Sequence, residues 1–299
     1  MYDLIIVGGG LAGITAAIYA ARKEMNFIII SPEFGGEIAN TPYVENWPGE
    51  KHIGGMELAQ KYFEHMKSLN VNIVEDIVTE IKKEGEKFVV KTYEKTFESK
   101  TVIWATGSKY RELKVPGEEK FKGRGVTYCS TCDGPLFKGK TVAVVGAGNN
   151  GLTSAIYMSE IAEKVYLINK NPIIKGDAIL AEKLINNKKV EIIHNARIKE
   201  IRGEKLVTGI TIITPEGEKN INLQGVIVNV GYTPITEPIK NLVHLDPSGY
   251  VSVDAKKMTH VPGFFAAGDV VNNPYKQLVI SASDGCTAAL GAYDYLSSR

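Results

Sequence analysis

Two copies of one short glycine pattern constrain the fold of this chain more than any other feature. Leu4 to Gly13 reads LIIVGGGLAG and Val142 to Gly151 reads VAVVGAGNNG, so the copies lie 138 residues apart in a chain of 299. Each copy is an apolar β-type run followed by G-x-G-x-x-G and by apolar residues at helical spacing. A second strand-like run follows each copy, at Phe27 to Ile30 and at Val165 to Ile168. The pattern predicts two βαβ units.

The glycines of such a turn have separate mechanical roles. The first permits the tight turn, the second lets the backbone approach a pyrophosphate, and the third packs the helix against the strand. The N-terminus of the helix then offers free N–H groups and a positive dipole end to phosphates. We therefore expect two dinucleotide sites, one at Gly8, Gly10 and Gly13 and the other at Gly146, Gly148 and Gly151. The alternative is a pair of glycine-rich turns that bind nothing.

The charge balance argues against nucleic-acid and membrane surfaces as partners. Lys and Arg number 35 against 34 Asp and Glu, and no run of like charge stands out. No apolar stretch approaches the roughly 20 residues that a membrane span needs. The chain opens with the strand-like MYDLIIVGGG and leaves no room for a signal peptide, which predicts a cytoplasmic protein.

The segments after the second copy predict how the domains are connected. They are rich in β-type runs up to about Val230, and from about His244 the chain returns to strand, turn and a final amphipathic helix. We expect an α/β protein of two Rossmann-like domains, the second inserted in the first. The predicted ranges are 1–114 plus 245–299 for the first domain and 117–242 for the second.

Cys129 and Cys132 form a C-x-x-C pair in GVTYCSTCDG. A dithiol at this spacing can close into a small disulfide, and in a reducing compartment the motif indicates redox or metal chemistry. A zinc site would need two more ligands, whereas the third cysteine, Cys286, lies in an apolar helical context and the five histidines are scattered. We therefore predict a redox pair and no metal.

Asp133 follows Cys132 directly. A thiol-disulfide cycle needs a proton donor for the leaving thiolate, and Asp133 is the candidate acid. The alternative is that Asp133 only turns the backbone ahead of Gly134 and Pro135.

Taken together, these residues resemble the low-molecular-weight thioredoxin reductases essentially end to end. The segments that carry the resemblance are GGGLAG (8–13), VENWPG (44–49), WATG (104–107), FKGRGVTYCSTCDG (121–134), VVGAGNNG (144–151) and FFAAGDV (264–270), with Gln277 downstream. The resemblance implies that the first domain binds FAD and that the second binds a nicotinamide cofactor. It also implies a homodimer whose domains rotate to expose the cysteines alternately to the flavin and to thioredoxin.

The resemblance also assigns roles to individual residues. Gly8, Gly10 and Gly13 would hold the FAD pyrophosphate, and Asp269 the phosphate or ribityl side. Cys132 would be the thiol next to the isoalloxazine, Cys129 the one that attacks the disulfide of the partner, and Asp133 the acid. The further residues expected at the FAD are Asn46, Thr106, Gly107, Gly268 and Gln277.

The chain departs from the family in two places. NADPH-using members carry an HRRxxxR cluster that grips the 2′-phosphate, whereas Ile168 to Gly176 reads INKNPIIKG here, with Lys170, Asn171 and Lys175 in place of the arginines. No acidic residue stands at the strand end for a ribose 2′-OH either. Glu37 replaces the usual glutamine near the flavin.

Loss of the arginines resembles a pyridine-nucleotide-independent subgroup that takes electrons from ferredoxin. We therefore expect a thioredoxin-disulfide reductase whose donor is not NADPH, with reduced ferredoxin favoured over NADH or NADPH. Two other classes stay open: an FAD-dependent dithiol oxidase, and a redox-sensing flavoprotein that is not an enzyme.

Overall fold

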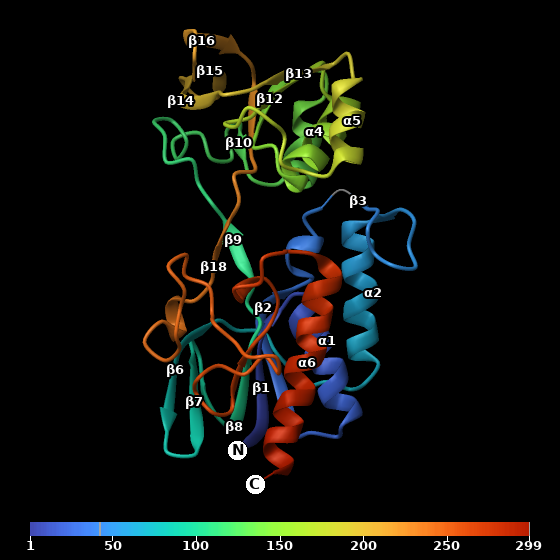
Figure 1. The fold of residues 1–299 in the computed structure, drawn as a ribbon, viewed down its shortest axis with the longest axis vertical. Helices are drawn as coiled ribbons and strands as arrows, with labels where there is room; N and C mark the ends of the chain where they lie inside the picture. The colour runs from blue at the N-terminus through green and yellow to red at the C-terminus, as the bar shows by residue number, and fades with distance from the viewer. Residues whose placement is uncertain (42, 299) are drawn as a thin grey trace. The chain divides into compact units, whose positions relative to one another are not determined.

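The structure is a computed structural model and describes residues 1–41 and 43–298. The chain divides into two compact units (Figure 1). Unit 1 contains residues 1–39, 43–109 and 233–298, and unit 2 contains Asn40, Thr41 and residues 110–232. Each unit is built on its own sheet.

Unit 1 is built on a seven-stranded sheet in the order β5-β2-β1-β8-β7-β6, with β19 pairing β8. Its strands are β1 (Tyr2–Gly9), β2 (Phe27–Phe34), β5 (Ile73–Val74), β6 (Val78–Glu84), β7 (Lys87–Thr92), β8 (Thr96–Trp104) and β19 (Phe264–Ala266). The pairs of β1, β2, β5, β8 and β19 are parallel, and β6 and β7 add an antiparallel extension. A parallel sheet of this kind must be covered on both faces.

One face of this sheet is covered by helices, which lie side by side in Figure 1. They are α1 (Leu11–Arg22), α2 (Gly55–Lys67) and α6 (Leu278–Ser297). The other face packs against Ile239, Val243, Val251 and Val271, which belong to the largely irregular chain that precedes α6. The small elements of unit 1 are η1 (Gly36–Ile38), β3 (Tyr43–Val44), β4 (Ile53–Gly54), η3 (Glu237–Ile239) and η4 (Gly268–Val270).

Unit 2 is built on a five-stranded, wholly parallel sheet in the order β10-β17-β11-β12-β13. Its strands are β10 (Val126–Thr127), β11 (Thr141–Val145), β12 (Lys164–Ile168), β13 (Val190–Ile193) and β17 (Gly225–Val228). Its helices are α3 (Ser130–Asp133), η2 (Gly134–Phe137), α4 (Asn149–Ile161) and α5 (Ala178–Ile185). A three-stranded antiparallel sheet, β14 (Arg197–Gly203), β15 (Val207–Thr214) and β16 (Gly217–Asn222), packs with it.

The predicted α/β class is confirmed. Both predicted βαβ units exist, as β1-α1-β2 and β11-α4-β12, and in each the two strands pair in parallel. The chain crosses between the units in a two-stranded ladder of β9 (Ser108–Tyr110) and β18 (Tyr232–Pro234). Within the described residues, no helix combines the length and the apolar character needed to cross a membrane.

An aromatic pair on β7 and β19, two strands that pair with β8, provides a test of the core of unit 1. Phe88 is fully buried, with its ring centroid 5.6 Å from that of Phe264. We expect Phe88→Ala to lower the free energy of unfolding by about 3–5 kcal/mol, because burial and packing are both lost. Urea unfolding of the parent and the variant measures this loss of stability. The control is Tyr93→Ala, at a side chain that is 74% exposed, which should change stability by no more than about 0.5 kcal/mol. Equal effects of the two variants would refute this account of the core.

Candidate functional site

The first glycine loop joins β1 to α1 by close backbone contacts. Gly8 has a φ of +116°, and a Cβ there would lie 2.3 Å from the carbonyl oxygen of Ala105. A Cβ on Gly13 would lie 1.9 Å from the carbonyl oxygen of Gly8. Side chains are therefore excluded at both positions, and the helix begins directly on the strand end.

The N-terminus of α1 is enclosed and carries no side-chain cap. Its N-cap residue is Gly10, and Leu11 and Ala12 are only 7% and 5% exposed. The first N–H groups of a helix have no partner within the helix. The space at Gly10 is open, since a Cβ would meet nothing within 4 Å. Buried amides beside open space fit the pyrophosphate of a dinucleotide.

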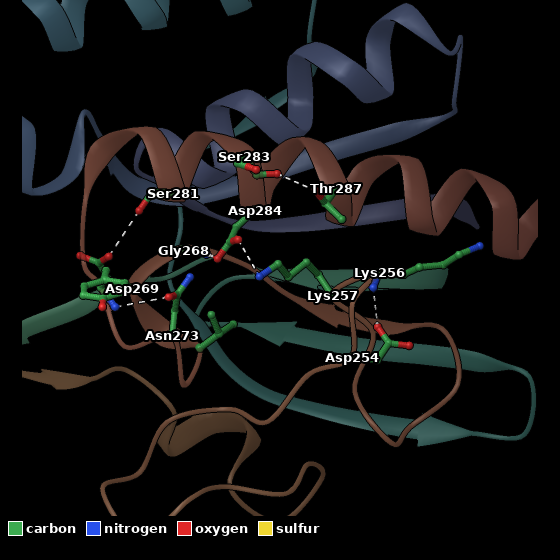
Figure 2. Close-up of polar contacts among 12 residues, drawn as sticks. Asp254, Lys256, Lys257, Gly268, Asp269, Asn273, Ser281, Ser283, Asp284 and Thr287 are labelled. Carbon is green, nitrogen blue, oxygen red and sulfur yellow. Dashed lines mark hydrogen bonds and ion pairs between the residues drawn. The ribbon is translucent and has the colours of Figure 1, made fainter. Parts of the chain in front are cut away.

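The turn Gly268–Asp269 packs beside this loop. A Cβ on Gly268 would lie 2.8 Å from the Cβ of Ala12 in the first turn of α1. Asp269 accepts a hydrogen bond from Ser281 Oγ at 3.3 Å (Figure 2). Burial raises the pKa of the Asp269 carboxyl above its usual range. The neighbouring Asp284 carboxylate adds to the rise, while the Lys276 ammonium and the Ser281 hydroxyl oppose it.

The other residues expected in the first domain take part in three hydrogen bonds. Asn46 Nδ2 donates to Gln277 Oε1 at 3.1 Å across 231 residues of sequence. Thr106 Oγ1 donates to the carbonyl oxygen of Ile235 at 2.9 Å, and the Ile235 N–H donates to the carbonyl oxygen of Gly107 at 3.1 Å. The structure therefore brings Asn46 and Gln277 together, and ties the loop after β8 to Ile235.

Glu33 is a candidate that the sequence analysis missed. It lies at the end of β2, and its carbonyl oxygen lies 2.3 Å from the position of a Cβ on Gly9 in the glycine loop. In dinucleotide folds an acidic residue about 20 positions after the motif holds the ribose. Glu33 follows Gly13 by 20 positions, so this spacing was the signal that could have found it.

The second glycine loop repeats the backbone geometry of the first. Gly146 has a φ of +113°, and a Cβ on Gly151 would lie 2.0 Å from the carbonyl oxygen of Gly146. Gly148 is the N-cap of α4 and again carries no side-chain cap. Unlike the first loop, this one is open, because Gly148 and Asn150 are exposed.

The loop after β12 uses its polar side chains internally. The buried Asn169 donates to the carbonyl oxygen of Ile173 at 2.9 Å and accepts from the Asn171 N–H at 3.1 Å. The N–H groups of Lys175 and Gly176 donate to the carbonyl oxygen of Ala147, whereas the side chains of Lys170 and Lys175 are exposed. These two lysines provide charge without a fixed fork for a 2′-phosphate.

Asn229 is a second residue that sequence reasoning missed. Its Nδ2 is buried and has no hydrogen-bond partner among the described residues. Its carbonyl oxygen lies 2.1 Å from the position of a Cβ on Gly146. A buried unpaired donor beside the second glycine loop is consistent with a polar ligand there.

Cys129 and Cys132 form a disulfide at the start of α3, with a Cα–Cα distance of 5.4 Å. Cys129 is the N-cap, and the Cys132 N–H donates to its Sγ at 3.1 Å. Cys132 is exposed and Cys129 half-buried. Ser130 Oγ lies 3.0 Å from Ser154 Oγ, so α3 packs on the helix that follows the second glycine loop.

Asp133 is fixed by the strand that precedes the cysteines. Thr127 Oγ1 donates to Asp133 Oδ2 at 2.6 Å and accepts from the Cys129 N–H at 3.1 Å. The carboxylate is therefore held beside the disulfide by a buried hydroxyl. No group of three or more His, Cys, Asp or Glu side chains in the described parts of the chain is placed to hold a metal ion.

Comparison with protein families and curated proteins gives consistent matches. The family model for pyridine nucleotide-disulphide oxidoreductases matches residues 2–285. A Bacillus subtilis NADH dehydrogenase and an alkyl hydroperoxide reductase of Pseudomonas aeruginosa (its F subunit) are 40% and 41% identical over 99% of the chain, which spans only 58% of each of them. A Bacillus subtilis thioredoxin reductase is 36% identical, with 99% of this chain and 95% of that protein covered.

Solved structures agree with these matches. A Lactococcus lactis thioredoxin reductase has a TM-score of 0.98 at 31% identity, with both chains covered completely. The T. acidophilum thioredoxin reductase has a TM-score of 0.95 at 39% identity over 99% of this chain and 98% of that one. A Clostridium acetobutylicum ferredoxin-flavin thioredoxin reductase has a TM-score of 0.56 at 31% identity, covering 99% and 98%.

The raised pKa of Asp269 predicts a pH-dependent stability effect. A carboxyl whose folded pKa lies above its unfolded value stabilises the fold below the unfolded pKa, and this contribution is lost as pH rises through the folded pKa. At neutral pH, Asp269→Asn should therefore unfold at higher urea than the parent in the ligand-free state. The gain should shrink as pH falls towards about 3.9. A gain that is constant with pH would contradict this account.

Proposed function

Because the chain belongs to the pyridine nucleotide-disulphide oxidoreductase family and is an FAD protein with the thioredoxin reductase fold, we propose that it is a thioredoxin-disulfide reductase. In this proposal electrons pass through FAD and the Cys129–Cys132 disulfide to thioredoxin. The observation that carries it is the disulfide at the start of α3, with Cys132 exposed and Asp133 held beside it.

The proposed FAD site is the enclosed first loop, with Gly8, Gly10 and Gly13 at the pyrophosphate. Its uncapped buried amides and the open space at Gly10 support this assignment. Gly268 and Asp269 pack on the same helix end. We place Asn46, Thr106, Gly107 and Gln277 along the rest of the flavin. The predicted ranges are 1–114 plus 245–299 for FAD and 117–242 for the second nucleotide fold, and we propose to move their edges to those of the compact units, because residues 110–114 lie in unit 2 and residues 233–242 in unit 1. The proposed assembly is a homodimer.

FAD, when bound, supplies two electrons at once. Cleavage of the Cys129–Cys132 bond takes up two electrons and two protons and gives two thiols. Cys129, as thiolate, attacks one sulfur of the thioredoxin disulfide, so that a mixed disulfide forms and one thioredoxin thiolate leaves. Cys132 then attacks Cys129 Sγ, which releases the second thioredoxin sulfur and re-forms the bond.

Asp133 is the proposed proton donor for the leaving thiolate. It adjoins Cys132 in sequence, and the hydrogen bond from Thr127 Oγ1 holds its carboxylate at 2.6 Å. The same hydroxyl accepts from the Cys129 N–H. The Thr127 side chain therefore positions both the acid, Asp133, and the backbone of the nucleophile, Cys129. An acid must be held in this way within reach of the group that it protonates.

The proposed electron donor is not NADPH, and reduced ferredoxin is the first candidate. Lys170, Asn171 and Lys175 replace the arginines, and both lysines are exposed. A low-potential iron-sulfur protein near about −400 mV lies roughly 130 mV below thioredoxin, on the order of 6 kcal/mol downhill for two electrons. Reduced ferredoxin therefore has enough driving force to reduce thioredoxin without a nicotinamide cofactor.

NADH is the second candidate, and two observations favour it. The second glycine loop keeps the backbone geometry of the first, with the buried, unpaired Nδ2 of Asn229 beside it. One 40% identical relative is a Bacillus subtilis NADH dehydrogenase. An NADH site would need no grip on a 2′-phosphate, so the missing arginines do not count against it.

We expect Cys129→Ser and Cys132→Ser each to reduce thioredoxin-disulfide turnover at least about 1,000-fold, because neither can form the disulfide. Both should keep their FAD, measured by flavin absorbance per chain. The matched control is Cys286→Ser, since Cys286 is the free cysteine on α6, and its turnover should stay within about two-fold. Retained turnover in either C-x-x-C variant would exclude the proposed cycle.

The donor is tested by anaerobic stopped-flow absorbance of the flavin with ferredoxin, NADH and NADPH offered separately, followed by oxidised thioredoxin. Bleaching by reduced ferredoxin alone, with reoxidation by thioredoxin, is the expected result. Bleaching of the flavin by NADH at a rate comparable to that with reduced ferredoxin would identify NADH as the donor. Rapid bleaching by NADPH would show that Lys170 and Lys175 suffice, and would overturn the donor proposal. Rapid peroxide formation with a small dithiol would indicate a dithiol oxidase instead.

A further inference from the structure

We propose that the buried ion pair between Lys257 and Asp284 is a positioning pair for FAD, which holds the Gly268–Asp269 turn against the first glycine loop. This inference rests on the proposed FAD site. The two residues come from different segments of unit 1, Lys257 from the loop before β19 and Asp284 from α6, and their side chains point toward one another (Figure 2).

The pair is short and shielded from water. Lys257 Nζ lies 2.6 Å from Asp284 Oδ1, and the two side chains are 19% and 5% exposed. Lysine-carboxylate pairs elsewhere in the chain are far more exposed, such as Lys61–Glu50, with side chains 50% and 35% exposed, and Lys82–Glu80, at 61% and 47%. Removing one partner of a buried pair leaves an uncompensated charge, whereas an exposed pair contributes little.

The second oxygen of Asp284 reaches the turn itself. Asp284 Oδ2 accepts a hydrogen bond from the Gly268 N–H at 3.4 Å. Gly268 packs closely on Ala12, since a Cβ built on Gly268 would lie only 2.8 Å from the Cβ of Ala12. Gly285, the next residue of α6, also packs on Ala12. A Cβ built on Gly285 would lie 2.1 Å from the carbonyl oxygen of Ala12. The carboxylate therefore ties the Gly268 turn to α6, and the turn and the helix both pack against Ala12 at the end of α1 that offers the free amides.

Lys257 occupies a backbone conformation that lysine seldom adopts. Its φ is +65°, in the left-handed region that favours glycine. The loop is fixed by Asp254, whose Oδ1 accepts from the N–H groups of Lys256 and Met258. Strain of this kind persists where the surrounding structure holds it. A glycine at position 257 would relieve the backbone strain while it removes the side chain with its ammonium, so a faster release of FAD cannot come from backbone strain.

The pair also sets the charge around Asp269. The Asp284 carboxylate is one of the groups that raise the pKa of Asp269, after burial itself. Lys257 balances that carboxylate at 2.6 Å. With Lys257 removed, the Lys276 ammonium would be left to balance both Asp284 and Asp269, and the added negative charge beside the helix end would oppose the FAD pyrophosphate.

The test measures how fast the holoenzyme releases FAD after dilution, by the recovery of flavin fluorescence. We expect Lys257→Gly to release FAD at least ten-fold faster than the parent. The double variant Lys257→Met with Asp284→Asn, which leaves no unpaired carboxylate and keeps an oxygen for the Gly268 N–H, should recover part of that loss of FAD retention. Lys257→Arg, which keeps the charge, should stay within about three-fold. The matched control is the exposed pair Lys256–Asp294 on the same two segments, at 3.2 Å with side chains 66% and 60% exposed. Lys256→Met and Asp294→Asn should release FAD within two-fold of the parent.

Thermal unfolding with and without added FAD distinguishes a positioning role of the Lys257–Asp284 pair from a purely structural role. Ligand binding to the folded state raises stability according to its Kd, so a positioning role shrinks the FAD-dependent rise in Tm, whereas a structural role lowers both Tm values equally. Lys257→Gly with an unchanged release rate and an unchanged FAD-dependent rise would overturn the inference. Failure of the parent itself to retain FAD would instead refute the proposed function.

Discussion

The molecule depends on two places where one stretch of backbone meets another with no side chain between them. At Gly13 and Gly151, the helix start presses on the carbonyl oxygen of the preceding glycine turn at a distance that excludes any Cβ. This contact aims the first amides of α1 and α4 past the end of each parallel sheet, which is where dinucleotide folds hold a pyrophosphate. The rest of each unit serves to hold this contact: strands buried on both faces, and helices that cover them.

The two loops share a geometry but differ in their surroundings. Around the first, Leu11 and Ala12 are buried and the Gly268 turn closes in, whereas Gly148 and Asn150 at the second are exposed. An enclosed site suits a group that stays bound through many turnovers, and an open site suits one that must exchange. The division of labour that we propose, resident FAD in unit 1 and a visiting or absent nicotinamide in unit 2, follows from this difference in burial.

Much of this architecture could be predicted because its signals are local. The glycine loops, the strands beside them and the C-x-x-C pair each occupy a dozen residues or fewer, and the α/β class follows from them. Contacts between distant residues could not be derived that way. The Asn46–Gln277 hydrogen bond spans 231 positions and was not predicted, although the resemblance placed both residues at the FAD. Lys257 and Asp284 lie in a loop and a helix that no periodicity relates, and the unpaired Nδ2 of Asn229 follows from packing alone. Glu33 was within reach, through its spacing from Gly13.

The paired strands β9 and β18 place the exit from unit 1 next to the return to it. The polypeptide leaves unit 1 after Lys109 and re-enters it at Thr233, and the two crossing strands are hydrogen-bonded neighbours. Because the two cut points adjoin, a short splice could reconnect unit 1 without displacing its sheet. Excising residues 110–232 would therefore remove the disulfide and the second glycine loop together, and leave the sheet and the first glycine loop of unit 1 continuous.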